Sequence, residues 1–312
     1  MKILITGAAG NLGSLLADHL LRVTSLELNL MQFRRSVKSA LVVPGRSVVV
    51  HADLSSVESV SAAVEGVDQI VHFAGVLFKA NPGSFLPTTN TQYFKNLVDA
   101  AKLAGVRRII LISFPHVEGP TSFDKPAIGR LDGNPISYHA KTRLDEEHYL
   151  FDQFPDSISL RVGMVYGKGV LMIEAARWFS KHRLLGVWSE NTQIHLISTF
   201  DFCEACRAAL ELPSANGIYH VGDEGKVTLQ EFLDMSCRHW GYRVPYRMPL
   251  WLIYSAAKCF EFYSMVSGGV SPLTKDFIDI GRVSYYGDTK RFRTELLPIL
   301  RYATVATGIK NL

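Results

Sequence analysis

The feature that most constrains the fold is a turn with three evenly spaced glycines. An apolar run at residues 3–6 leads directly into Gly7-Ala8-Ala9-Gly10-Asn11-Leu12-Gly13, and apolar residues then recur at helical spacing over residues 12–21. Between a strand and a helix, one glycine permits a tight turn, a second lets a bound group approach the backbone, and a third lets the helix pack closely on the strand. The sequence therefore predicts a strand–turn–helix unit whose backbone is open to a ligand.

The start of this helix also indicates the chemistry of the ligand. Backbone N–H groups that open a helix have no partner inside it, and the helix dipole adds attraction for negative charge. We therefore expect the turn to hold the pyrophosphate of a dinucleotide. The residues expected to contact it are Gly7, Ala9, Gly10, Asn11, Leu12 and Gly13. A glycine-rich turn without a ligand is the alternative.

Short apolar runs alternate with helical patterns through the first half of the chain. Strands are predicted at residues 3–6, 26–33, 47–50, 69–73, 108–113 and 157–162, and helices at 12–21, 57–64, 93–104 and 137–151. This alternation is typical of parallel strands joined by right-handed crossovers. The sequence predicts an α/β fold with a Rossmann-type, doubly wound parallel sheet.

The second half is less regular and is interrupted by glycine and proline. We expect residues 1–166 to form a dinucleotide-binding Rossmann domain. Residues 167–312 are expected to form a smaller, discontinuous substrate-binding lobe, some segments of which return to the sheet. An aromatic-rich stretch around Trp251, Phe260 and Phe262 is interpreted as the core of this lobe, or as a wall for a hydrophobic substrate or a contact with a membrane surface.

Composition excludes several classes of protein. The chain of 312 residues is 47% hydrophobic with a net charge of +4 and has no dense Lys/Arg run, so a nucleic-acid partner is not expected. The most apolar late segment, residues 248–257, is stopped by Lys258 and is about half as long as a transmembrane span. An apolar strand at once after Met1-Lys2 does not resemble a signal peptide. We therefore expect a cytoplasmic protein without a transmembrane span.

The four cysteines do not suggest a disulfide framework or a metal site. Cys203 and Cys206 lie in an amphipathic helical pattern and are interpreted as core residues, and Cys237 and Cys259 form no second C-x-x-C pair. The sequence also contains no H-E-x-x-H motif, so no metal is expected.

The end of the second predicted strand discriminates between coenzymes. Folds of this kind that prefer NAD place an acid there, whereas those that prefer NADP offer an arginine to the extra phosphate. In this chain the strand runs into Arg34-Arg35-Ser36, with no Asp or Glu. The pattern favours NADP(H), with Arg34 as the first candidate contact and NAD(H) as the alternative. Solvated surface arginines are the other interpretation.

Several segments together resemble the extended branch of the short-chain dehydrogenase/reductase superfamily, the NAD-dependent epimerase/dehydratase family. They are the glycine spacing at 7–13, the Asp53-Leu54 pair, residues 71–75 (VHFAG), residues 161–167 (RVGMVYG) and residues 217–223 (GIYHVGD). The resemblance implies that Asp53 and Leu54 contact the adenine and that Ala74 and Gly75 lie beside the nicotinamide ribose. A helix cap at Asp53 is the competing interpretation. His72 is interpreted as structural.

The same resemblance implies a catalytic serine, tyrosine and lysine. Family members use a tyrosine as acid/base, a lysine four residues later that lowers the tyrosine's pKa and binds the ribose, and a serine that polarises the substrate carbonyl. The candidates are Ser113, Tyr138 and Lys141. Tyr138 stands three residues before Lys141 rather than four, so two alternatives stay open: another group such as His139 replaces it, or the site has no redox chemistry.

The resemblance implies an NADP(H)-dependent oxidoreductase that transfers a hydride between nicotinamide and the alcohol or carbonyl of a small-molecule substrate. One alternative is a nucleotide-sugar epimerase or dehydratase with tightly bound NAD(P). The other is a non-catalytic NAD(P)-binding sensor or scaffold, which the displaced tyrosine favours. Family members often dimerise through a four-helix contact, so a homodimer is a further expectation.

Overall fold

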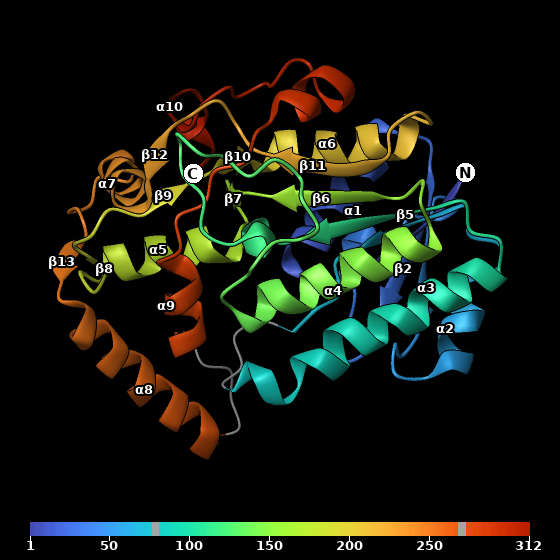
Figure 1. Ribbon diagram of the computed structural model, residues 1–312, viewed down its shortest axis with the longest axis horizontal. Helices are drawn as coiled ribbons and strands as arrows, with labels where there is room; N and C mark the ends of the chain where they lie inside the picture. Colours follow the sequence, from blue (N-terminus) through green and yellow to red (C-terminus); the bar gives the residue numbers. More distant parts are fainter. Residues whose placement is uncertain (77–80, 268–272) are drawn as a thin grey trace.

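A parallel sheet forms the centre of the molecule (Figure 1). The computed structural model describes residues 1–76, 81–267 and 273–312. Seven strands pair in the order β11-β6-β5-β4-β1-β2-β3, each parallel to its neighbours. Their bounds are β1 (Lys2–Thr6), β2 (Glu27–Gln32), β3 (Ser47–His51), β4 (Gln69–His72), β5 (Arg108–Ser113), β6 (Ile158–Val162) and β11 (Gly217–Val221). The predicted Rossmann-type α/β fold is confirmed.

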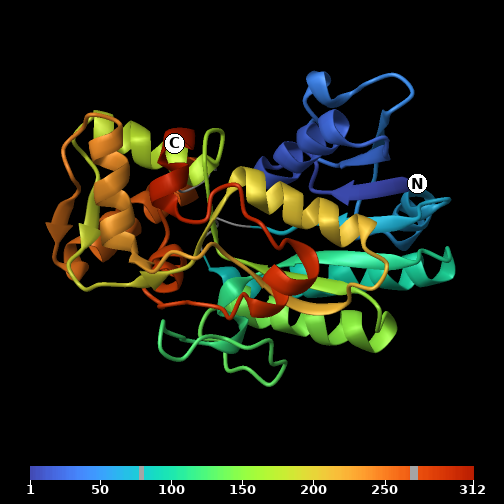
Figure 2. The ribbon, with the colours of Figure 1, turned by 90° about the horizontal axis from the view of Figure 1, so that it is seen from above.

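Helices cover both faces of this sheet, as Figure 2 shows. The helices that do so are α1 (Asn11–Val23), α2 (Val57–Val64), α3 (Tyr93–Leu103), α4 (Tyr138–Gln153) and α6 (Thr199–Glu211). Because side chains alternate along a strand, Ile3 and Ile5 pack into the core beneath α1 and α6, whereas Leu4 faces the core beneath α2 and α3. Each face is therefore buried, which explains why the strands read as continuous apolar runs.

Serine caps fix where three of these helices begin, namely α2, α4 and α6. The Ser56 hydroxyl accepts a hydrogen bond from the N–H of Ser59 (3.2 Å) at the start of α2. The Ser137 hydroxyl does the same for Ala140 (3.2 Å) at the start of α4. Such caps satisfy N–H groups that have no partner inside the helix. Ser137 therefore makes Tyr138 the first residue of α4, and this decides which side chains the helix turns inward.

The remaining strands and α-helices follow residue 163. They are β7 (Met164–Tyr166), α5 (Leu171–Lys181), β8 (Gly186–Trp188), β9 (Gln193–Ile194), β10 (Leu196–Ser198), β12 (Val227–Thr228), α7 (Leu229–His239), β13 (Tyr246–Met248), α8 (Leu250–Ser267), α9 (Lys275–Gly281) and α10 (Val305–Gly308). The short strands pair as β7–β10, β9–β12 and β8–β13. Single helical turns are η1 (Ser39–Leu41), η2 (Pro82–Ser84), η3 (Pro87–Gln92), η4 (Pro115–Glu118), η5 (Phe292–Leu296) and η6 (Ile309–Asn311).

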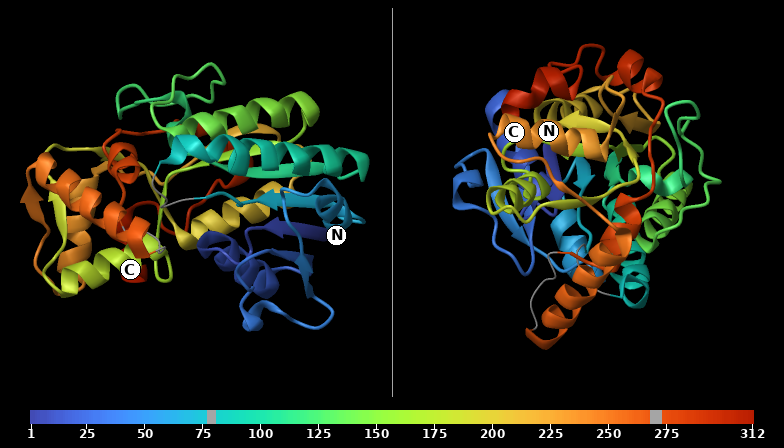
Figure 3. Two further views of the ribbon diagram at one scale, coloured as in Figure 1. Left: turned by 90° about the horizontal axis from the view of Figure 1, so that it is seen from below. Right: turned by 90° about the vertical axis from the view of Figure 1, so that its left-hand side faces the viewer.

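A second lobe lies beside the sheet, and we define it as α5, α7, α8 and α9 with β8, β9, β12 and β13 (Figures 2 and 3). Its own apolar cluster is built from Val187, Trp188, Ile253, Ala257 and Ile278. Helix α6 and strand β11 come from beyond residue 166 but belong to the layers of the sheet. The division of the chain at residue 166 stays a prediction. Across the described ranges, every helix falls short of the length or the apolarity that crossing a bilayer requires.

Candidate dinucleotide and active site

The turn after β1 has a geometry that only glycine satisfies. Gly7 has φ of 71°, in the left-handed region, and its carbonyl accepts a hydrogen bond from the N–H of Gly10 (2.8 Å). A Cβ atom on Gly13 would lie 2.4 Å from the Gly7 carbonyl oxygen, so any side chain there would push α1 away from the turn. Helix α1 therefore starts in close contact with the end of β1, as the spacing predicts.

The start of α1 fits the pyrophosphate of a dinucleotide. Its N-cap is Gly10, which offers no side-chain acceptor, and the first turn contains no acidic residue. The N–H groups of this turn and the positive end of the helix dipole are thus open to an anion. Ala9, Asn11 and Leu12 are half-buried around the turn.

Asn11 joins this turn to the second lobe. Its side-chain amide donates to the carbonyl of Gly169 (2.6 Å) and accepts from the N–H of Leu171 (2.9 Å), the first residue of α5. The side chain of Asn11 is therefore committed to protein contacts, and its backbone is the part available to a phosphate.

The end of β2 carries cations and no carboxylate. Arg34 and Arg35 are exposed in the bend after β2, and the Arg34 guanidinium lies 5.3 Å from the centre of the Phe33 ring. The Gln32 side chain accepts a hydrogen bond from the N–H of Val37 (2.8 Å) and closes the bend. Among the described residues, neither arginine has an ion-pair partner, so both are available to a ligand phosphate.

Asp53 and Leu54 follow β3, at the same edge of the sheet as the glycine turn, because parallel strands end at a common edge. The Asp53 carboxylate accepts from the N–H of Ser55 (2.9 Å), while the cap of α2 is Ser56. The helix-cap interpretation of Asp53 is therefore wrong. The Leu54 carbonyl accepts from the Asn96 side chain (3.0 Å).

His72 at the end of β4 supports the structure. Its Nδ1 lies 2.9 Å from the Thr6 hydroxyl, which also accepts from the N–H of Ala74 (3.3 Å). Burial lowers the pKa of the His72 imidazole well below its usual range, so the ring is neutral at physiological pH. The pair holds the ends of β1 and β4 together beside Ala74 and Gly75.

Two residues of α4 face the end of β4, and they are His139 and Arg143. Arg143 Nη2 donates to the Ala74 carbonyl (3.3 Å) and lies so close to Gly75 that a Cβ there would be 2.8 Å away. His139 Nε2 lies 3.2 Å from the Val76 carbonyl. Residues four apart share one face of a helix, so this pair has the spacing that the family's tyrosine and lysine have.

Tyr138 and Lys141 lie on other sides of the same helix. Tyr138 is 51% exposed and its ring lies against Gly83. Lys141 is also exposed, with its ammonium 5.6 Å from the centre of the Tyr138 ring. Each residue turns a helix by about 100°, which places Lys141 nearly opposite His139. The structure brings Tyr138 and Lys141 together, but away from Ala74 and Gly75.

Ser113 does not join either pair. Its hydroxyl donates to the buried Glu147 carboxylate (2.6 Å). Glu147 also accepts from the Ser159 hydroxyl (2.7 Å) and from Arg161 (2.5 Å). In this arrangement Ser113 helps to anchor α4 on β5 and β6. The predicted grouping of Ser113, Tyr138 and Lys141 is thus not found, because the one-residue shift in spacing rotates the tyrosine and the lysine out of the site.

The second lobe contributes an acid that the sequence analysis missed. Asp276 Oδ2 lies 2.7 Å from His139 Nδ1, and both side chains are largely buried. Asp276 stands in the first turn of α9, far from His139 along the chain. The four-residue spacing of His139 and Arg143 was a signal that could have identified these two, but no sequence pattern pointed to Asp276.

Glu146 fixes the position of the Arg143 side chain. The two side chains form an ion pair, and Glu146 is fully buried. Burial raises the pKa of the Glu146 carboxyl to about 7, although the neighbouring Arg143 acts against this shift. The guanidinium is therefore fixed between the Glu146 carboxyl and the Ala74 carbonyl.

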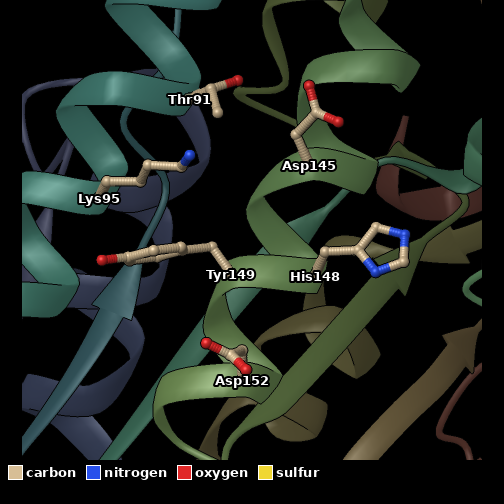
Figure 4. A pocket seen from close by; sticks show the side chains of 6 residues that line it. All are labelled: Thr91, Lys95, Asp145, His148, Tyr149 and Asp152. Carbon is tan, nitrogen blue, oxygen red and sulfur yellow. The ribbon is translucent and has the colours of Figure 1, made fainter.

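A separate hollow on the outer side of α4 is not part of this site (Figure 4). It is lined by Thr91, Lys95, Asp145, His148, Tyr149 and Asp152. These side chains come from η3, α3 and α4. The Tyr149 hydroxyl donates to Asp99 (2.5 Å), and the Lys95 ammonium lies 5.0 Å from the Tyr149 ring centre. The hollow is open and polar, and none of its lining residues belongs to the His139–Arg143 pair.

The glycine turn and the strand-end residues lie within one recognised family region. The family model described as NAD(P)H-binding matches residues 7–163, about half of the chain. The chain belongs to the NAD(P)H-binding family. The prediction of an NAD(P)-binding family is confirmed.

Two curated relatives of this NAD(P)H-binding protein are uronate dehydrogenases. The one from Pseudomonas syringae pv. tomato is 28% identical over 172 residues, which cover 52% of this chain and 58% of the relative. The one from Pseudomonas putida is 28% identical over 183 residues, covering 57% and 66%. The matched region thus spans less than two thirds of the length of either relative.

Solved structures of similar fold include enzymes that bind nucleotide sugars. MoeE5 in complex with UDP-glucose and NAD has a TM-score of 0.77 at 18% identity, with 100% of this chain and 97% of that chain covered. DesIV, the dTDP-glucose 4,6-dehydratase from Streptomyces venezuelae with NAD and TYD bound, also has a TM-score of 0.77 at 18% identity, with 100% and 95% covered. At this identity the likeness establishes the shared fold.

Proposed function

We propose that this protein is an NADP(H)-dependent oxidoreductase that acts on an alcohol or carbonyl group of a small-molecule substrate. The observation that carries the proposal is the glycine turn, where Gly7 and Gly13 bring bare amide groups to the carboxyl edge of the sheet. Membership of the NAD(P)H-binding family supports the same ligand.

The preference for NADP(H) rests on the bend after β2. Exposed Arg34 and Arg35 offer cations to a 2′-phosphate, and no carboxylate in the bend is placed to accept ribose hydroxyls. Asp53 and Leu54 at the end of β3, and Ala74 and Gly75 at the end of β4, would line the adenine and nicotinamide sides.

A bound nicotinamide supplies or accepts the hydride, so the protein must manage the proton on the substrate oxygen. We infer that His139 is the acid/base group in place of the outward-facing Tyr138. Asp276 holds Nδ1, which leaves Nε2 to exchange a proton with the substrate oxygen at the position where it now faces the Val76 carbonyl. In reduction the carbonyl carbon gains the hydride, the oxygen gains this proton, and an alcohol results.

Arg143 is the cation that acts together with His139 in the proposed site. Its guanidinium lies beside the Ala74 carbonyl and Gly75, where the family resemblance places the nicotinamide ribose. An arginine there can donate to ribose hydroxyls, as the family's lysine does. Lys141, on the opposite side of α4, is assigned no part in coenzyme binding.

A second candidate function is non-catalytic binding of NADP(H). It is favoured by the commitment of the Ser113 hydroxyl to Glu147 and by the contact of His139 Nε2 with the Val76 carbonyl. Under this alternative the coenzyme binds and the chain acts as a sensor or scaffold.

Titration of intrinsic tryptophan fluorescence with NADPH and NADH tests the proposal. We expect saturable binding, tighter for NADPH, which is lost in Gly13→Val because the new side chain meets the Gly7 carbonyl. Asp18→Ala, at a partly exposed site on α1, is the matched control. A panel of uronates, nucleotide sugars and simple carbonyls then tests turnover. Absence of coenzyme binding would refute the proposal, and binding without turnover on the whole panel would favour the sensor.

A further inference from the structure

Helix α8 presents an apolar face that the second lobe does not cover. Its inner side packs through Ile253 and Ala257 into the cluster with Val187, Trp188 and Ile278. Its outer side carries large apolar side chains that are 37 to 75% exposed: Trp251, Leu252, Phe262, Tyr263, Met265 and Val266. At about 3.6 residues per turn, Trp251, Phe262 and Val266 fall on one stripe opposite Ile253 and Ala257. Helices that are apolar on all sides are normally buried.

The shape of this region makes the apolar stripe a projecting edge. Helix α8 runs along the outer margin of the second lobe, and its C-terminal half extends beyond the rest of the molecule (Figures 1 and 3). The stripe is thus convex and directly accessible to a broad surface.

The charges on α8 suit an anionic partner. Lys258 is exposed on the helix, and Lys275 is exposed at the start of α9. The acid of α8, Glu261, is half-buried and accepts a hydrogen bond from the N–H of Lys275 (2.8 Å). Aromatic residues with a lysine beside them are typical of helices that lie in the interface of a membrane.

We propose that α8 docks this protein onto a membrane surface that contains anionic phospholipid. The helix would lie in the plane of the interface, with Trp251, Phe262, Tyr263 and Val266 among the acyl chains and Lys258 at the headgroups. The proposal is independent of the proposed enzymatic activity, since no residue of the glycine turn or of the His139 pair takes part.

A second copy of the chain fits this stripe less well than lipid does. The 18-residue helix is roughly 27 Å long, and its convex stripe would meet a second copy only along one narrow line of contact. Stable protein–protein interfaces bury about 800 Å² per partner. A lipid surface needs no matching partner surface, only the apolar side chains and the cation.

Co-sedimentation with vesicles tests this assignment. We expect the wild-type protein to pellet with vesicles of phosphatidylcholine and phosphatidylglycerol, and less with phosphatidylcholine alone. The double variant Phe262→Ser, Tyr263→Ser should lose roughly tenfold or more in vesicle affinity, and Lys258→Glu should reduce the preference for phosphatidylglycerol. Leu103→Ser and Ile299→Ser, at residues that are 88% and 83% exposed elsewhere, should bind like the wild type.

Two outcomes would overturn the proposal. One is wild-type protein that stays in the supernatant with both vesicles. The other is a concentration-dependent dimer on size exclusion that the double variant abolishes, because the stripe would then be covered by a second copy. Near-UV circular dichroism and coenzyme titration confirm that each variant is folded, so a loss of vesicle binding can be assigned to the stripe.

Discussion

The His139 imidazole and the Asp276 carboxylate meet at 2.7 Å and join the first turn of α4 to the first turn of α9. The contact couples the sheet to the second lobe. A carboxylate this close to Nδ1 attracts a proton to that nitrogen electrostatically, although the two groups are not aligned for a hydrogen bond.

Replacement of Asp276 tests this coupling. We expect Asp276→Asn to lower kcat roughly 10- to 100-fold, because the amide cannot stabilise a charged imidazole, and to shift the pH dependence of kcat. The variant should also lose about 1–3 kcal/mol of unfolding free energy. Asp279→Asn, which affects another α9 carboxylate that accepts from Tyr254, is the control. Equal effects of both variants on kcat would assign Asp276 a merely structural role.

The orientation of α4 makes a prediction about the tyrosine. Tyr138→Phe should retain turnover close to that of the wild type, because its hydroxyl lies outside the site, whereas His139→Phe should abolish it. Steady-state kinetics with the best substrate of the panel provide the measurement. A large loss in Tyr138→Phe would contradict the observed geometry and restore the tyrosine to the mechanism.

Arg143 makes a prediction about coenzyme affinity. Arg143→Met should weaken NADPH binding roughly tenfold, the loss of a charge-assisted hydrogen bond, and Arg143→Lys should recover part of it. Lys141→Met is the matched control on the opposite side of α4. Fluorescence titration measures all three. Equal affinity in Arg143→Met and wild type would exclude the arginine from ribose binding.

The bend after β2 predicts coenzyme selectivity. Arg34→Glu should lower the affinity for NADPH roughly tenfold or more, through repulsion of the 2′-phosphate, and should leave NADH binding nearly unchanged. Arg107→Glu, at an exposed site near the opposite edge of the sheet, should change neither. The ratio of the two dissociation constants is the quantity to compare. An unchanged ratio in Arg34→Glu would mean that this arginine is solvated surface.

The buried Asp223 predicts how stability depends on pH. Burial raises the pKa of its carboxyl to about 7, above the value in an unfolded chain. The folded state then binds the proton more tightly, so this group's contribution to stability is present at low pH and is lost as the pH rises through 7. Asp223→Asn keeps an acceptor for the N–H of Gly225. It should therefore be more stable than the wild type at pH 8 by ~1–3 kcal/mol and nearly equal at about pH 4, below which both states bind the proton. Denaturant unfolding at both pH values is the measurement, and a difference that does not change with pH would contradict the assignment.

Local sequence signals were sufficient to predict the glycine turn and six of the seven strands of the sheet; the edge strand β11 was expected only as an unspecified segment that returns to the sheet. Residues 57–64 form the predicted helix because a serine cap and an apolar stripe coincide there, and Gly7 and Gly13 are determined by backbone geometry within one turn. The face of α4 was harder to predict. Both Tyr138–Lys141 and His139–Arg143 have helical spacing, and only the packing of α4 against β4 decides between them. The partnership with Asp276 depends on how the second lobe folds back, which no local pattern records.

Asn11 ties the turn beneath the proposed pyrophosphate to the carbonyl of Gly169 and the N–H of Leu171. The Asn11 side-chain amide thus binds directly to the segment that leads into α5, and no other side chain lies between them. A shift of the glycine turn would therefore move the first residue of α5 with it. From this linkage we expect the proposed coenzyme to bind before the substrate and to orient the second lobe.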